Sequence, residues 1–445
     1  MVTTNASHIR QLHWVPIIFG IVVPCLVAIG AFSQATPASG QDLDTLLSKK
    51  QYRQLEQALQ AQREELPEQE SSYFSGVMAN RLNQINESLQ RLEPLIPNLV
   101  ITNPVRGEVA LCTVADDYAK IYRYADASRV YTEASRVSKQ QNLPPPCEAI
   151  REASRWALLS NAPAQTVTSA GQFTMQGRRD VLGLIQVPVS IGGYAGSWIL
   201  DSGANLSIIS RSVAVQIHVA ISPATDTADG ISGGSVQVHL GVIPEINLGP
   251  AVFHNVAVLV VPDSQLDFPQ VNYHIEGSLG LPILAALGRV TVYRNGLIRF
   301  GGERDAARNP ALAHNLFLEN FTPVIAADFG LGDQLFTIDT GAVRTILSAA
   351  FYHDSGAVNS TEFVELELVG AGGTLVSPAY QLRDVGVRLG GSCTRLEIVD
   401  VLTKPIGLAD EFYGNIGEST LSSFASFTLD FNTMHFETTG PRVCR

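Results

Sequence analysis

Two patterns of hydrophobic and polar positions divide the chain near residue 165. Residues 36–165 contain runs such as LLSKKQYRQLEQALQAQREEL, in which apolar residues recur at spacings of three and four among strong helix formers. From residue 166 onward, short runs such as VLGLIQVPVSIGG alternate apolar and polar residues and end in glycine, which is typical of strands. The pattern predicts a mainly β chain in which an α-helical region, residues 36–165, precedes the strands.

The β region is an internal repeat. The segment WILDSGANLSIIS contains Asp201, and the segment FTIDTGAVRTILS contains Asp339, 138 positions later. Farther along each half, the segments around Gly280 and Gly417 lie 137 positions apart and align without a gap.

A glycine-rich stretch also lies between the Asp and the later glycine in each half, at Gly233, Gly234, Gly372 and Gly373. These stretches are interpreted either as ordinary hairpin tips or as mobile tips that close over a ligand. Because the order of features is the same in both halves, the sequence predicts two similar β lobes, residues 166–305 and 306–445. The two lobes would be related by a pseudo-twofold axis.

Such an axis would bring Asp201 and Asp339 face to face. Two carboxylates about 3 Å apart cannot both ionise cheaply, so they share one proton and titrate as a pair. One then acts as a base on water while the other acts as an acid toward a carbonyl, a chemistry that cleaves amides without a metal. The residues after each Asp fit this pair, since they are short hydroxyls able to bond the facing loop and glycines that permit tight turns: Ser202, Gly203, Thr340 and Gly341.

The motifs DSGA and DTGA, each with a later apolar-Gly segment, resemble the active-site motifs of aspartic peptidases. The Ala after the Gly makes both more similar to the retropepsin-like branch than to the pepsin branch. The resemblance covers residues 180–440 and implies a fused pseudo-dimer with Asp201 and Asp339 as the catalytic pair. It also implies that the glycine-rich hairpins are flaps over a peptide substrate, and that Gly280 and Gly417 support the Asp loops. A third DSGA, at Asp354, has no apolar strand before it and is interpreted as a turn.

The sequence departs from the retropepsin pattern in both halves. Asn205 and Val343 occupy the positions where those enzymes carry an acidic residue, and Leu281 and Glu418 stand where an Arg would pair with that acid. An exported aspartic endopeptidase is the leading hypothesis. Asn205 and Val343 give some support to an alternative hypothesis, in which the lobes bind peptides without cleaving them and the helical region is a scaffold.

The helical region contains a stretch similar to a tetratricopeptide helical hairpin. About one repeat matches, through small and large positions at Ala115, Tyr118, Ala127, Tyr131 and Ala134. A helical packing domain is the favoured interpretation. The alternatives are a module that binds a protein partner and a segment that covers the cleft until it is removed.

The N-terminal residues predict export. Residues 15–32 form an uncharged, mostly apolar run that follows Arg10 and precedes a small-x-small site ending at Ala35. Residues 1–35 are therefore interpreted as a cleaved signal peptide or as an uncleaved membrane anchor. Either predicts a periplasmic or secreted protein, with anchorage in the inner membrane as the second possibility.

The remaining cysteines fit an oxidising compartment. An even number of cysteines remains after residue 35, which favours disulfides, with buried free thiols as the alternative. Four cysteines can pair in three ways. In one of these, Cys112 bonds to Cys147 and Cys393 bonds to Cys444, so that each disulfide joins residues of one region.

Composition excludes several functional classes. The net charge is −12 and no basic patch stands out, so nucleic acid is not an expected partner. Neither CxxC nor HExxH spacing occurs, so the sequence predicts no metal and no cofactor. The expected partners are a peptide or protein substrate and, through the helices, a second protein.

Overall fold

A computed structural model of the chain describes residues 42–144, 147–168, 171–229, 235–269, 272–302, 313–356, 362–370, 373–406 and 411–442. The chain separates into two compact units, Met1–Gly40 and Gln41–Arg445, so the helices and the strands belong to one unit. Strands occupy more of it than helices do, which confirms the prediction of a mainly β chain with helices first. No helix among the described residues is long and apolar enough to cross a membrane, and residues 15–32 lie outside them.

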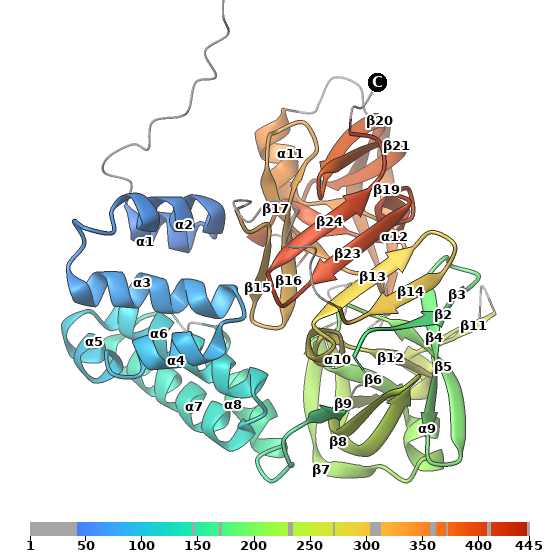
Figure 1. Cartoon of the computed structure of the whole chain (residues 1–445), viewed down its shortest axis with the longest axis horizontal. Coiled ribbons are helices and arrows are strands. Elements are labelled where there is room, and N and C mark those ends of the chain that lie inside the picture. Colours follow the sequence, from blue (N-terminus) through green and yellow to red (C-terminus); the bar gives the residue numbers. More distant parts are fainter. Residues whose placement is uncertain are drawn as a thin grey trace, which may run out of the picture. The chain divides into compact units, whose positions relative to one another are not determined.

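The helical region is a stack of helices (Figure 1). Its elements are α1 (Leu43–Ser48), α2 (Tyr52–Ala61), α3 (Glu68–Arg81), α4 (Ile85–Leu92), α5 (Ile96–Thr102), α6 (Pro104–Lys120), α7 (Tyr124–Gln141) and α8 (Ala149–Leu158). The five residues that resemble a tetratricopeptide hairpin lie on α6 and α7 and are all buried. The resemblance to that repeat itself stays a prediction.

The predicted disulfide between Cys112 and Cys147 is confirmed. It joins the middle of α6 to the segment before α8, with the two Cα atoms 6.2 Å apart. Cys393 is also disulfide-bonded, and its expected partner, Cys444, lies outside the described residues.

The first β sheet follows the helices. Its strands run in the order β1-β9-β6-β12-β5-β4-β8-β7, with β3 beside β4. Their bounds are β1 (Thr166–Thr168), β3 (Arg178–Arg179), β4 (Ile185–Ile191), β5 (Tyr194–Leu200), β6 (Ser207–Ser210), β7 (Ala220–Asp229), β8 (Ser235–Leu248), β9 (Ala251–Val261) and β12 (Gly277–Leu279). Helices α9 (Arg211–Gln216) and α10 (Leu281–Ala286), the 3-10 turn Asp263–Gln265 and the strand pair β10 (Asp267–Phe268) with β11 (Tyr273–His274) complete this part.

The second large sheet is built from the C-terminal half in the order β15-β16-β17-β22-β18-β21-β20-β19. Its strands are β15 (Leu316–Glu319), β16 (Thr322–Asp328), β17 (Gln334–Ile338), β18 (Ile346–Leu347), β19 (Glu362–Gly370), β20 (Gly373–Leu389), β21 (Ser392–Leu402) and β22 (Gly414–Ile416). Helices α11 (Ala349–Ser355) and α12 (Glu418–Leu421) follow β18 and β22.

The two halves repeat the same unusual pairing at their centres. In the first sheet, β12 runs parallel to β5 and antiparallel to β6, while β6 runs parallel to β9. In the second sheet, β22 runs parallel to β17 and antiparallel to β18, while β18 runs parallel to β21. Each central strand therefore inserts between the two strands that flank an Asp loop.

A further sheet combines both halves of the repeat (Figure 1). Its strands are β2 (Phe173–Gln176), β14 (Leu297–Phe300), β13 (Arg289–Tyr293), β23 (Ser426–Asp430) and β24 (His435–Thr439), in that order. At its centre Thr291 pairs with Thr428, and their hydroxyls are 2.9 Å apart. These two threonines are 137 positions apart, so a residue of the first half pairs with its own counterpart in the second.

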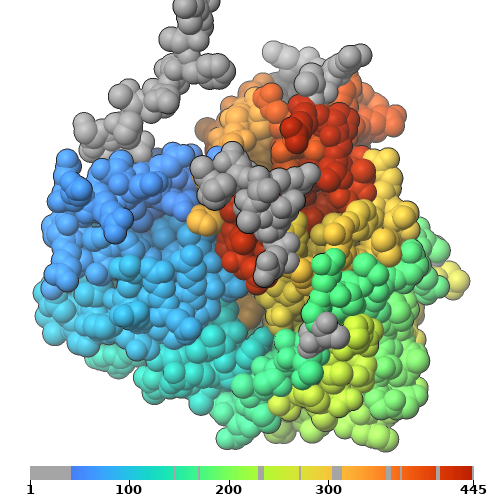
Figure 2. Space-filling view, viewed as in Figure 1, coloured from blue at the N-terminus to red at the C-terminus, as the bar shows by residue number. Residues whose placement is uncertain are grey.

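The helices are continuous with the β core. One cluster of buried apolar residues extends from Leu43 to Phe436, and ring contacts join Tyr52 to Phe317 and Trp156 to Phe321. Figure 2 shows residues of α7 and α8, coloured teal, against the green residues of the first sheet. The predicted domain limit near residue 165 falls between α8 and β1, and that near residue 305 falls among residues 303–312, outside the described part.

Candidate functional site

Two equivalent loops carry Asp201 and Asp339. Each Asp directly follows a buried strand, β5 or β17, and each backbone N–H donates to the carbonyl of the central strand beside it. Asp201 N lies 3.0 Å from Leu279 O, and Asp339 N lies 3.0 Å from Ile416 O. The inserted central strands thus fix the position at which each Asp leaves its strand.

Ser202 and Thr340 interlock the two loops. Ser202 N donates to Thr340 Oγ1 at 2.9 Å, and Thr340 N donates to Ser202 Oγ at 3.1 Å. Each hydroxyl also donates across to the strand that leads into the other loop, Ser202 to Ile338 O at 3.0 Å and Thr340 to Leu200 O at 2.6 Å. Both side chains are buried, so these four bonds are shielded from competition by water.

The same contact brings the two carboxyl groups together. A Cβ atom added at Gly341 would lie 2.6 Å from Asp201 Cγ, and one added at Gly203 would overlap the Asp339 carboxyl. Glycine at both positions therefore lets each carboxyl approach the facing loop closely. Both Asp residues are half-buried, so the pair keeps an accessible side.

Electrostatics makes the pair titrate together. Burial raises the pKa of Asp201 to about 7, and the negative charge of Asp339 adds to that rise. Burial also raises the pKa of Asp339, against hydrogen bonds from Gly341 N–H and from the Asn415 and Asp201 side chains. Two carboxyls coupled in this way can share one proton.

Gly280 and Gly417 lie behind the two Asp loops. Gly280 N donates to Ser207 Oγ at 3.0 Å, and Gly417 N donates to Thr345 Oγ1 at 3.0 Å. A Cβ at Gly280 would lie 2.6 Å from the Leu206 carbonyl carbon, and one at Gly417 would overlap backbone oxygens of the second loop. Larger residues would displace the loops that hold the Asp residues.

The glycines predicted as flap tips fall mostly outside the described residues. This holds for Gly233, Gly234 and Gly372. Gly373 is the first residue of β20, has a φ of +104° and is exposed. The β7–β8 and β19–β20 hairpins lead toward these positions, and their role as flaps stays a prediction.

Sequence reasoning missed one ion pair beside the site. The sequence shows Glu418 where a retropepsin would carry an Arg, and no Arg nearby in the chain. The structure pairs buried Glu418 with Arg179 of β3, at 2.6 Å. Burial raises the pKa of Glu418, while Arg179 opposes that rise and Asp339 adds to it. No local sequence pattern predicts this ion pair, because Arg179 and Glu418 are 239 positions apart.

Asp354 has different surroundings from the two paired Asp residues. The prediction that Asp354 lies in a turn is wrong, since it lies in helix α11, where it pairs with His353 and accepts a hydrogen bond from Tyr413 OH at 2.7 Å. Within the described residues, no group of three or more His, Cys, Asp or Glu side chains could hold a metal ion.

The paired-Asp geometry can be compared with known protein families. Residues 187–283 match the family model described as aspartyl protease. The matched segment contains β5, the Asp201 loop, the β7–β8 hairpin and the central strand β12 with Gly280. It supports a peptidase of an aspartic protease family. A search of the curated proteins finds no match.

Proposed function

We propose that this protein is an aspartic endopeptidase in which Asp201 and Asp339 form one catalytic dyad. The observation that carries the proposal is the reciprocal interlock of Ser202 and Thr340, which sets the two carboxyls against the facing loops. The family match to the segment around Asp201 supports the same chemistry.

A retropepsin-like, single-chain pseudo-dimer is the architecture proposed for the two lobes. Two contacts between counterparts of the repeat support it: Ser202 with Thr340, and Thr291 with Thr428. A contact between equivalent residues lies on the axis that relates them. Two such contacts therefore support a pseudo-twofold axis that passes through both of them, beside the proposed dyad.

The proposed reaction uses one ionised and one protonated carboxyl. Asp339, which accepts the shorter hydrogen bond from its own loop and lies beside the Asn415 amide, takes a proton from a water molecule as the water oxygen attacks the peptide carbonyl carbon. Asp201 gives its proton to the carbonyl oxygen, which forms a neutral tetrahedral intermediate. Asp339 then gives its proton to the peptide nitrogen while Asp201 takes a proton back from a hydroxyl of the intermediate. The C–N bond breaks, a carboxylic acid and an amine form, and the dyad again holds one proton, on Asp201.

Export is proposed for the same protein. The Cys112–Cys147 disulfide supports an oxidising compartment, and the apolar run of residues 15–32 supports a signal peptide or an anchor. A periplasmic or secreted location, with membrane anchorage as the alternative, follows from these two features. Binding of a second protein to the helical region remains a separate proposal.

The test is cleavage of a diverse peptide mixture between pH 3 and pH 8 by the full chain and by Asp201→Asn and Asp339→Asn. Each substitution should reduce cleavage by at least about a thousandfold without unfolding the protein, since neither half of the dyad works alone. Asp354→Asn is the matched control, because it changes the same DSGA motif at a position outside the pair. Near-normal cleavage by either dyad variant would refute the proposal. Tight peptide binding without turnover by the wild type would favour the peptide-binding alternative.

A further inference from the structure

The two central strands place a polar side chain beside each carboxyl of the pair. Ser278 on β12 pairs with Ile199, two residues before Asp201, and the next position on the same face of β12 is Gly280. Because a glycine stands level with the Asp, the Ser278 side chain is its nearest neighbour on that strand. On the second lobe, Asn415 of β22 has the same register relative to Asp339.

Both side chains are buried, and the register places each on the central strand beside one Asp of the pair. Asn415 is 8% exposed, and its Oδ1 accepts a hydrogen bond from Thr337 Oγ1 at 2.8 Å. That bond leaves the amide N–H groups of Asn415 for the Asp339 carboxyl, with which its side chain interacts. Ser278 is 2% exposed, and its hydroxyl makes no close hydrogen bond within the described part of the chain. The carboxyl it interacts with is that of Asp201.

We propose that Ser278 and Asn415 are positioning residues that donate hydrogen bonds to Asp201 and Asp339 and make the two carboxyls unequal. The inference rests on the proposed peptidase function and deepens it. It assigns the negative charge to Asp339, which faces an amide held in place by Thr337, and the proton to Asp201, which faces a single rotatable hydroxyl.

Hydrogen bonding explains the direction of the inequality. A donor stabilises the ionised form of a carboxyl, so each of these side chains lowers the pKa of the Asp beside it. Asp339 also accepts from Gly341 N at 2.8 Å, whereas the Asp201 contacts to its own loop are 3.1 Å long. The carboxyl with the shorter loop hydrogen bond and the fixed amide donor ionises first, so Asp339 acts as the base on water.

The test compares Asn415→Leu with Ser278→Ala in the full chain. Carbon-13 NMR of labelled Asp carboxyls, assigned with the two Asp→Asn variants, measures both titrations of the pair. Asn415→Leu should raise the lower apparent pKa by about one to two units, and Ser278→Ala should raise the upper one by about one. In the pH profile of kcat/KM, the acidic limb should move up in the first variant and the alkaline limb in the second.

Conservative and distant variants control for disturbed packing. Ser278→Thr retains a hydroxyl donor, and Asn415→Ser puts a hydroxyl donor in place of the amide, so the titrations of both variants should stay close to those of the wild type. Asn415→Ala replaces Asn415→Leu if the latter does not fold. Thr291→Val removes a buried hydroxyl in the shared sheet and should leave both titrations unchanged.

The outcomes separate this inference from the proposed function. Unchanged titrations in folded Asn415→Leu and Ser278→Ala would overturn the inference, as would equal shifts in Thr291→Val. If the titrations move as expected but the wild type shows no Asp-dependent cleavage, the proposed function fails while the assignment of donors stands.

Discussion

Removing the Thr340 hydroxyl tests the interlock on which the site depends. In Thr340→Ala, Ser202 N loses its acceptor at 2.9 Å and Leu200 O loses its donor at 2.6 Å. Thr340 is 1% exposed and Ser202 is 0% exposed, so water has little access to replace either bond. A buried backbone group left without a partner costs about 1–3 kcal/mol. The two losses together predict a fall of about 2–5 kcal/mol in the free energy of unfolding.

Activity should fall with stability, because the same bonds hold the carboxyls together. A shift of either loop by a fraction of an ångström would change the distance between the two carboxyls. We therefore expect at least about a tenfold loss of kcat under conditions where the variant is folded. Urea unfolding followed by circular dichroism gives the stability, and peptide cleavage gives kcat.

Two variants make the Thr340 measurement specific. Thr340→Ser keeps the hydroxyl and should retain most of the stability and activity. Thr428→Ala also deletes a buried hydroxyl, but its partner there is another side chain, Thr291, rather than two backbone groups, so it should cost only about 1 kcal/mol and leave kcat unchanged. A loss below about 0.5 kcal/mol for Thr340→Ala, with normal kcat, would show that the interlock does not hold the loops.

Three further changes test the rest of the unit. Burial raises the pKa of Asp117 to about 7, so ionising Asp117 destabilises the folded state. The free energy of unfolding of Asp117→Asn should equal that of the wild type near pH 4 and exceed it increasingly as the pH rises to 7. Urea titrations at each pH measure this difference. Replacing Cys112 and Cys147 by Ser opens a loop that spans 35 positions and should lower the free energy of unfolding by about 3–4 kcal/mol, measured by urea titration without a reductant so that the disulfide of Cys393 stays intact. Glu319→Gln removes a carboxylate shared by two cations and should cost about 3–5 kcal/mol in the same assay, whereas Asp333→Asn, at an exposed pair, should cost less than about 1 kcal/mol.

The site could be predicted from sequence because its residues are local to a repeat. The strand before Asp201 and the strand before Asp339 carry the same short pattern, and the pattern alone places a carboxyl after a buried strand in each half. The 137-residue offset even aligns Ser278 with Asn415, so the repeat contained a signal for these positions that the motif did not single out.

Contacts between distant segments could not be predicted in this way. Arg179 and Glu418 lie in different halves and at positions that the repeat does not relate, so neither periodicity nor spacing indicates their pairing. The register of β13 against β23 could not be predicted either, although Thr291 and Thr428, which pair at its centre, are equivalent positions of the repeat. Aligning the two halves of the repeat shows which strands are equivalent. It does not show that two equivalent strands, β13 and β23, also pair with each other.

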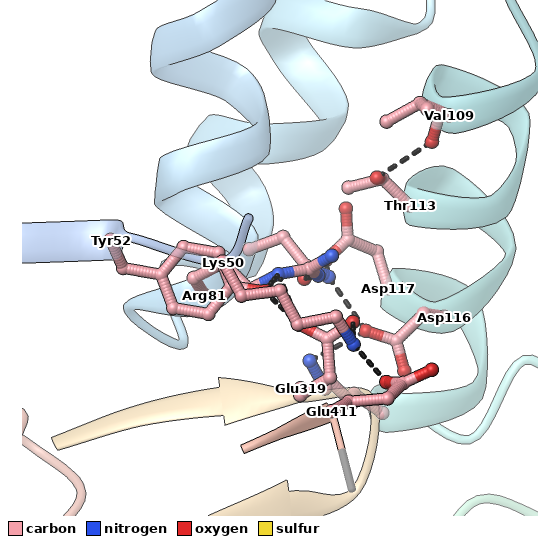
Figure 3. Close-up of polar contacts among 11 residues, drawn as sticks. Lys50, Tyr52, Arg81, Val109, Thr113, Asp116, Asp117, Glu319 and Glu411 are labelled. Carbon is pink, nitrogen blue, oxygen red and sulfur yellow. Dashed lines mark hydrogen bonds and ion pairs between the residues drawn. The ribbon is translucent and has the colours of Figure 1, made fainter. Parts of the chain in front are cut away.

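The position of Glu319 bears on whether the helical region is a removable segment. Glu319 ends β15, and Figure 3 shows it among cationic and hydroxyl side chains of the helices. Arg81 lies 3.0 Å from it and Lys50 3.1 Å, and the Tyr52 hydroxyl donates to it. Burial alone would raise the pKa of Glu319, but the charges of Arg81 and Lys50 lower it to about 2.

A carboxylate with so low a pKa stays ionised, and so keeps its cations, between pH 3 and pH 8, the range of the proposed cleavage assay. Its stabilising effect is complete above its ordinary pKa of about 4.3 and is lost only as the pH falls toward 2. Mild acid would protonate carboxylates of ordinary pKa and so release a segment held by them. It would leave Glu319 ionised, and the helices would therefore stay bound. Removing the helices would leave Glu319 without Arg81 and would expose Phe317 of β15, which is 0% exposed in the intact chain. The contacts thus favour a permanent support of the second sheet over a temporary cover.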